Sequence, residues 1–155
     1  MKLAISCLSA LMIATAGPLE AMPVSDLDRA ALERLAAAND AAWNAKDVAA
    51  MAGQYTAHGS VRVSPASPTV EGSAAVSNFF GQAFGRRQGR FRHITTLDHL
   101  DEIAPGMAMA DAAVRVEQQQ PDGSWVLVRS FRNVSLVIRK GDQWKHRAVR
   151  AIPEN

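Results

Sequence analysis

The sequence predicts an α+β fold, in which three N-terminal helices pack on one face of a strongly curved, mainly antiparallel sheet. Between residues 25 and 85, apolar residues recur at the helical spacing of three and four. From residue 91 onward they alternate with polar residues, as in strands, and three turn sequences divide this part: Ala104-Pro105-Gly106, Pro121-Asp122-Gly123 and Lys140-Gly141-Asp142. At 155 residues, with 48% apolar composition, the chain has room for one domain core.

The first 21 residues are expected to be a signal peptide, leaving residues 22–155 as a single domain. Lys2 supplies a positive start, and the apolar run from Leu3 to Ala16 has secretory length but is short for a membrane span, the alternative reading. Cleavage is expected after Ala21, with Ala16 as the other candidate. We therefore expect a periplasmic or secreted protein with no stable membrane anchor after cleavage.

Composition excludes several classes of function. The only cysteine, Cys7, lies in the expected signal peptide, so the mature chain has no thiol for a disulfide, a metal site or a nucleophile. The histidines show no metal-ligand spacing, and no metal or cofactor is expected. The net charge is +2, and the four arginines between Arg86 and Arg92 fit a solvated turn better than a nucleic-acid site. Glycine loops for phosphates, serine triads and dinucleotide fingerprints are absent from the sequence.

The first helix is expected to begin after Ser25, which has an acid three residues later at Asp28, and to run to about Asp47. At 100° per residue, one face is apolar and the opposite face polar. The apolar face carries Leu32, Leu35, Ala42 and Trp43, and the polar face carries Arg29, Glu33, Asp40 and Asn44. Asn39 falls in the middle of the apolar face, so its amide either binds a ligand or ties the helix to a strand.

A second, short helix is expected from Val48 to Ala52, capped by Asp47, and the alternation from Ser60 to Ser64 predicts a short strand. Ser73 is expected to cap the third helix. In that helix, Phe79, Phe80 and Phe84 follow the spacing of one apolar face and would point into the core.

Four strands are predicted at 91–100, 107–119, 125–139 and 143–151, the last three forming an antiparallel meander. In the third of these strands, Phe131, Asn133 and Ser135 share one face with Arg129, which could meet a carboxylate ligand. The other face is also apolar, with Val126, Val128, Val134, Leu136 and Ile138. A sheet that is apolar on both faces indicates a partner, so we expect a homodimer, or else a covering N-terminal helix.

Four motifs in this order resemble those of a known superfamily. They are Trp43-Asn44-Ala45-Lys46-Asp47 at a helix end, Tyr55 before the first strand, Val70-Glu71-Gly72 before the phenylalanine-rich helix, and Arg139-Lys140-Gly141-Asp142-Gln143-Trp144 at the last hairpin. Over residues 26 to 151 the chain resembles the nuclear transport factor 2-like superfamily, in particular its SnoaL-like members and the small secreted SgcJ/EcaC type. The resemblance implies a cone-shaped α+β barrel with an apolar cavity at its open end, often paired into a dimer through the sheet.

The resemblance implies no single reaction, because this superfamily contains isomerases, dehydratases, cyclases and binding modules. Ketosteroid isomerase, a worked case of carboxylate base and oxyanion donors, shares the fold. Its base would fall on Val63 or Ser64, its tyrosine on Asn39 and its protonated acid near Ser135. None of these residues can serve in those roles, so the chain has a ketosteroid isomerase-like fold without its catalytic residues.

The candidate site is therefore a ligand pocket, with His93 as the candidate acid or base at neutral pH. The expected pocket residues are Asn39, Trp43, Tyr55, Phe80, Phe84, His93, Phe131, Asn133 and Ser135. Three functions remain open: an exported module that binds a small, largely apolar ligand; an isomerase, dehydratase or cyclase that uses His93 as acid or base and Asn39 as a polarising donor; and an interaction module that acts through the convex sheet.

Overall fold

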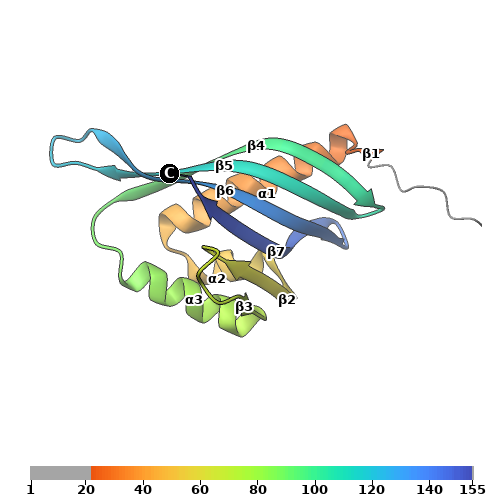
Figure 1. The fold of residues 1–155 in the computed structure, drawn as a ribbon, viewed down its shortest axis with the longest axis horizontal. Coiled ribbons are helices and arrows are strands. Elements are labelled where there is room, and N and C mark those ends of the chain that lie inside the picture. Colours follow the sequence, from red (N-terminus) through yellow and green to blue (C-terminus); the bar gives the residue numbers. More distant parts are fainter. Residues whose placement is uncertain (1–21, 155) are drawn as a thin grey trace, which may run out of the picture.

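The computed structural model describes residues 22–154 and confirms the predicted α+β fold, with helices packed on a mostly antiparallel sheet (Figure 1). The expected signal peptide lies outside the described residues. In chain order the elements are β1 (Met22–Pro23), α1 (Asp26–Ala45), α2 (Val48–Gly53), β2 (Tyr55–Arg62), β3 (Val70–Glu71), α3 (Ser73–Gly85), β4 (Phe91–Ala104), β5 (Met107–Gln119), β6 (Trp125–Lys140) and β7 (Gln143–Pro153).

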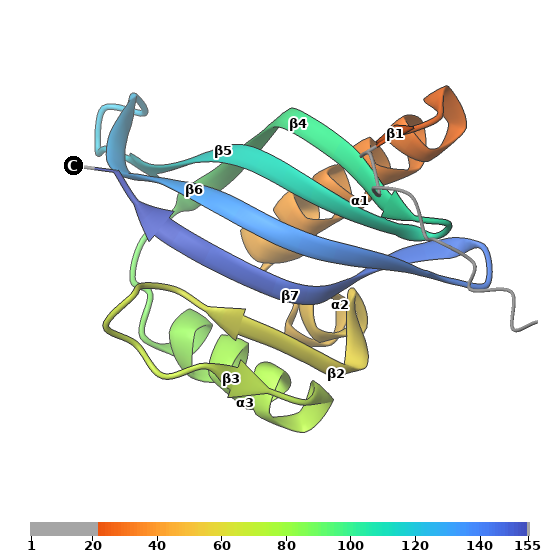
Figure 2. The same cartoon turned by 45° about the vertical axis from the view of Figure 1, so that its right-hand side comes forward.

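The strands form one sheet in the order β1-β4-β5-β6-β7-β2-β3. The predicted meander is present and includes β4, because β4, β5, β6 and β7 pair antiparallel in sequence order. Only β2 joins in parallel, against β7. Figure 2 shows the long strands bending across α1, with α2 and α3 gathered on the side of β2. This arrangement leaves a hollow between the helices and the concave face of the sheet.

The first two helix starts agree with the predicted caps. The Ser25 hydroxyl accepts from the Asp28 backbone N–H at 3.2 Å, and the Asp47 carboxylate accepts from the Ala50 N–H at 2.9 Å. The third helix is present, but its predicted cap was wrong. Gly72 precedes the helix with φ of 89°, no side chain caps the helix, and Ser73 is its first residue. The positive φ, which glycine adopts without steric cost, turns the chain from β3 into α3.

On the predicted polar side of α1, Arg29 and Glu33 are exposed. Asp40 and Asn44 instead face β4, which corrects their predicted position. Both side chains hydrogen-bond to β4. Successive helical residues differ by about 100°, so Asp40 lies at the edge of the apolar face beside Asn39. Because β4 covers this edge, the helix is enclosed over more than its apolar stripe.

Two buried clusters stabilise the fold. One joins the end of α1 to α2, α3, β2 and β7, and contains the predicted core residues Phe80 and Phe84. The other joins α1 to the sheet through residues that include Leu32 and Trp144. The Trp144 indole N–H donates to Asp28 at 3.1 Å, and Arg139 pairs with the same carboxylate. Among the described residues, no helix is long and apolar enough to cross a membrane.

The apolar row predicted for the other face of β6 holds only in part. Val134, Leu136 and Ile138 are half-buried there. Val128 was wrongly assigned to this row: Val116 pairs with Arg129 and Glu117 with Leu127, so Val128 is the extra residue of a β-bulge. The bulge breaks the two-residue alternation, and Val128 lines the hollow together with Arg129.

Candidate functional site

A cavity of about 560 Å³ lies between α1, α3 and the concave face of the sheet. This volume falls within the range usual for small-molecule sites. Most of the lining side chains are apolar. All nine residues expected in the pocket line it: Asn39, Trp43, Tyr55, Phe80, Phe84, His93, Phe131, Asn133 and Ser135.

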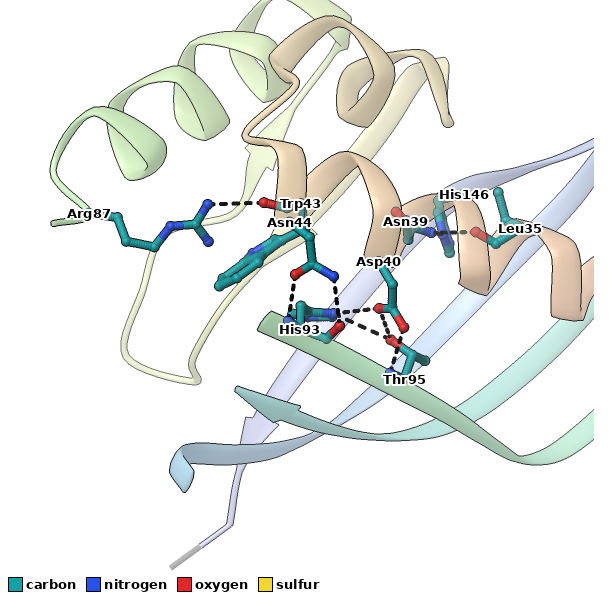
Figure 3. Close-up of polar contacts among 9 residues, drawn as sticks. All are labelled: Leu35, Asn39, Asp40, Trp43, Asn44, Arg87, His93, Thr95 and His146. Carbon is teal, nitrogen blue, oxygen red and sulfur yellow. Dashed lines mark hydrogen bonds and ion pairs between the residues drawn. The ribbon is translucent and has the colours of Figure 1, made fainter. Parts of the chain in front are cut away.

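The buried imidazole of His93 is held by a carboxylate that the sequence interpretation had placed on the wrong side of α1. His93 Nδ1 lies 2.7 Å from Asp40 Oδ1, and only 10% of the His93 side chain and 20% of the Asp40 side chain are exposed. Thr95 donates to the same carboxylate twice, through its backbone N–H at 2.8 Å and its hydroxyl at 2.7 Å. Figure 3 shows these contacts converging on Asp40.

This network determines the tautomer of His93. An ionised carboxylate only accepts hydrogen bonds, so the proton between it and His93 belongs to Nδ1. In neutral His93 the other nitrogen, Nε2, then carries a free lone pair. No described residue hydrogen-bonds to Nε2, and the side chain lines the cavity. His93 is therefore arranged as a base whose second nitrogen is oriented by a carboxylate.

The backbone at His93 is fixed as firmly as its side chain. Asn44 Oδ1 accepts from the His93 N–H at 2.6 Å, and Asn44 Nδ2 donates to the His93 carbonyl at 3.2 Å. On the cavity side, the ring packs 5.0 Å from the Trp43 ring and 5.9 Å from Phe131, measured between centroids. These contacts hold the imidazole in one position, which acid–base chemistry requires.

A second histidine, His146, lines the cavity and is held neutral. Asn39 Nδ2 donates to His146 Nε2 at 2.7 Å and to the Leu35 carbonyl at 3.3 Å, so the His146 proton sits on Nδ1. Burial lowers the pKa of His146 to about 4. Its Nδ1 is shielded from water and has no partner among the described residues. His146 thus carries a neutral N–H donor that meets no acceptor in the described chain.

Tyr55 lies against His146, with ring centroids 5.3 Å apart. Burial raises the pKa of Tyr55, so its phenol keeps its proton. The Tyr55 hydroxyl forms no hydrogen bond to another described residue. Tyr55 and His146 are thus adjacent neutral donors in the lining of the cavity. The sequence interpretation named Tyr55 as a pocket residue but not His146.

The remaining predicted residues are distributed along β6. Ser135 is buried, and Asn133 Oδ1 is shielded from water without a partner in the described chain. The guanidinium of Arg129 lies 5.6 Å from the Phe131 ring and lines the cavity. Of the positions that would match ketosteroid isomerase, Val63 lines the cavity, whereas Ser64 hydrogen-bonds to Ser67 outside it. In residues 22–154, no three His, Cys, Asp or Glu side chains gather as metal ligands would.

The family model of the SnoaL-like domain matches residues 26–150. No protein of curated function matches the sequence significantly. Several solved structures are similar in fold. ActVI-ORFA from Streptomyces coelicolor is 18% identical, with 81% of this chain and 97% of that chain covered and a TM-score of 0.72.

Two further structures have the same fold. A ketosteroid isomerase-like protein from Erwinia carotovora atroseptica is 16% identical over 84% of this chain and 99% of that chain, with a TM-score of 0.68. A protein from Catenulispora acidiphila in complex with S-DNPA is 19% identical over 82% and 95%, with a TM-score of 0.72. At these identities the similarity concerns the fold, and the site has to be interpreted from its own residues.

Proposed function

The chain belongs to the SnoaL-like domain family, and from this premise we propose that it is an enzyme that transfers a proton at carbon in a small, largely apolar substrate. The reaction class is that of an isomerase, dehydratase or cyclase. The observation that carries the proposal is the Asp40–His93 pair, whose free nitrogen Nε2 belongs to a residue that lines the cavity. We propose that this reaction takes place outside the cytoplasm, because of the expected signal peptide.

In the proposed reaction, His93 Nε2 takes a proton from a carbon next to a carbonyl group of the substrate. The C–H bond breaks, its electron pair moves toward the carbonyl, and negative charge develops on the carbonyl oxygen. Asp40 stabilises the imidazolium that forms, as an ionised acceptor at 2.7 Å. The proton then returns to another carbon in an isomerisation, or to a departing hydroxyl group in a dehydration.

The developing oxygen charge needs hydrogen-bond donors, and the structure replaces the donor expected from the sequence. Asn39 cannot polarise the substrate, because its amide nitrogen already donates to Leu35 and His146. Two neutral donors on residues that line the cavity can take this role, the Tyr55 hydroxyl and His146 Nδ1. Donors fixed in a site with little water stabilise such a charge more strongly than donors in solution.

A general-base probe tests this proposal without knowledge of the natural substrate. Nitrobenzisoxazole opens when a base removes its carbon-bound proton: the N–O bond breaks and a coloured cyanophenolate is released. The mature chain should accelerate this reaction, and His93→Gln should slow it by about 10²-fold or more. Asp40→Asn should also slow it, because the amide no longer favours the tautomer with a free Nε2.

The chain offers a matched control. His99 also pairs with an aspartate, Asp101, at 3.0 Å, but 66% of its side chain is exposed and it does not line the cavity. His99→Gln should leave the rate unchanged. If the wild type and His93→Gln react at equal rates, and circular dichroism shows that both proteins are folded, His93 is not the base.

The second candidate is an exported binding module for a small, largely apolar ligand. The observation that favours it is the shielded, unpartnered oxygen of Asn133 beside the cavity, which a bound ligand could satisfy. The similar protein from Catenulispora acidiphila was solved in complex with S-DNPA, which also supports it. Native mass spectrometry of the protein purified from its host tests this reading. A tightly retained small molecule, together with an inactive cavity in the benzisoxazole assay, would favour the binding module over the enzyme.

A further inference from the structure

The arginines of the chain divide into two groups according to whether they meet a carboxylate. Five described arginines lie within 4.0 Å of an Asp or Glu oxygen: Arg92, Arg115, Arg132, Arg139 and Arg147. Three others, Arg86, Arg87 and Arg129, line the cavity and have no such partner in the described chain. No Asp or Glu of the described chain lines the cavity. The cavity therefore carries positive charge that no described side chain neutralises.

Arg87 is the cavity arginine whose position is most constrained. Its guanidinium carbon lies 3.6 Å from the Trp43 ring centroid and 4.9 Å from that of Phe84, a stacked arrangement. Its Nη2 donates to the Trp43 backbone carbonyl at 3.0 Å. Figure 3 shows the guanidinium held at the end of α1 beside the Trp43 side chain.

Two of the three Arg87 nitrogens have no hydrogen-bond acceptor. Nε and Nη1 are both shielded from water and unpartnered among residues 22–154. Burial of the guanidinium also lowers the pKa of Arg87. Native proteins rarely leave such donors unsatisfied, and a group so placed requires an explanation such as a bound ligand.

The free donors have the geometry of a carboxylate site. A guanidinium has two edges, and each edge offers two parallel N–H groups, one of which belongs to Nη2. The bond to the Trp43 carbonyl uses a single Nη2 proton, so one complete two-donor edge remains. Such an edge matches the two oxygens of a planar carboxylate.

We propose that Arg87 binds a carboxylate group of the substrate, which is therefore a small, largely apolar carboxylic acid. This inference deepens the proposed function and rests on it. The Arg87 guanidinium and the His93 ring both lie within 5.0 Å of the Trp43 ring centroid. The carboxylate site and the base thus pack on the same indole, at one end of the cavity.

Matched probes test the inference. Naphthaleneacetate and naphthaleneacetamide have the same apolar body and similar shape, but only the first carries a carboxylate. Isothermal titration should show that the wild-type chain prefers naphthaleneacetate by about tenfold or more, as expected for a charge-assisted pair. Arg87→Gln should reduce this preference to near unity while leaving the affinity for the amide unchanged. Arg87→Lys, which keeps the charge without the two-donor edge, should give an intermediate preference.

Controls separate this inference from the proposed function. Arg115→Gln, at a side chain that is 59% exposed and outside the cavity, should keep the full preference. Tight binding of both probes without preference, or a preference that survives in Arg87→Gln, would overturn the carboxylate site and leave the proposed base intact. A wild-type chain that binds naphthyl phosphate more tightly than naphthaleneacetate would overturn the assignment to carboxylates. If neither naphthalene probe binds, the inference is overturned. The cavity could then no longer serve as the substrate site of the proposed function either.

Discussion

Acidification should destabilise this protein through His146. The residue is half-buried, and the part that is not packed against protein lines the cavity. Its pKa is about 4 in the folded chain, against an ordinary value of 6.5, because burial disfavours the charged imidazole. As pH falls below 6.5, the unfolded chain binds this proton before the folded chain does. The contribution of His146 to stability is therefore complete above pH 6.5 and is lost as pH falls toward 4.

The magnitude follows from the two pKa values. Each unit of difference between folded and unfolded states corresponds to about 1.4 kcal/mol, so the free energy of unfolding should be about 3 kcal/mol lower at pH 4 than at pH 7 through this group. That value applies to a cavity without water, and water beside the imidazole reduces it. A loss of this size is a large fraction of the stability of an ordinary domain.

The assay is urea unfolding of the chain from residue 22 onward, followed by tryptophan fluorescence at pH steps between 7 and 4. His146→Gln is the control variant, since the glutamine carbonyl can still accept from Asn39 but does not titrate. The stability difference between wild type and variant should shrink, or change sign, as the pH falls. A difference that stays constant within about 0.5 kcal/mol over this range would refute the reasoning, because carboxylates titrate equally in both proteins.

Three further predictions concern stability and assembly. Trp43→Ala should lower the free energy of unfolding by about 3 kcal/mol, since the indole packs on Phe84 and Arg87 but also faces the cavity; a loss under about 1 kcal/mol in urea would contradict this packing. Gly59→Ala should cost about 2 kcal/mol or more, because the added Cβ would lie 2.8 Å from the Tyr55 Cβ; an unchanged melting temperature would contradict it. Leu136→Asp should convert the proposed homodimer to a monomer in light scattering, and a wild type that is already monomeric would refute the proposed interface.

Local sequence signals predicted the starts of α1 and α2 because the interactions that fix these starts are local. Ser25 and Asp47 bond to backbone groups three residues away, so their capping roles can be recognised in the sequence itself. The start of α3 could not be predicted in this way. The Gly72 N–H donates to the carbonyl of Gly59 in β2 at 2.9 Å, and this long-range contact fixes where the helix begins.

The candidate site was only partly predictable for the same reason. His93 and the inward row of β6 follow the strand alternation. Asp40 lies at the edge of the α1 face, and only β4, more than fifty residues later in the chain, makes that edge part of the site. His146 lies next to a shift in the pairing of β6 with β7, between Leu136 and Val137, which changes the alternation that would reveal its direction.

Two consecutive residues of α1 assign different roles to the two cavity histidines. Asp40 is an acceptor for His93 Nδ1, so the charge that His93 gains on taking a proton meets a negative partner. Asn39 is a donor to His146 Nε2, so protonation of that nitrogen would place two donors against each other. A carboxylate favours the charged imidazole and an amide N–H opposes it. One histidine is thus suited to exchange protons and the other to stay a neutral donor, and the difference arises from the charge of their partners on one turn of helix.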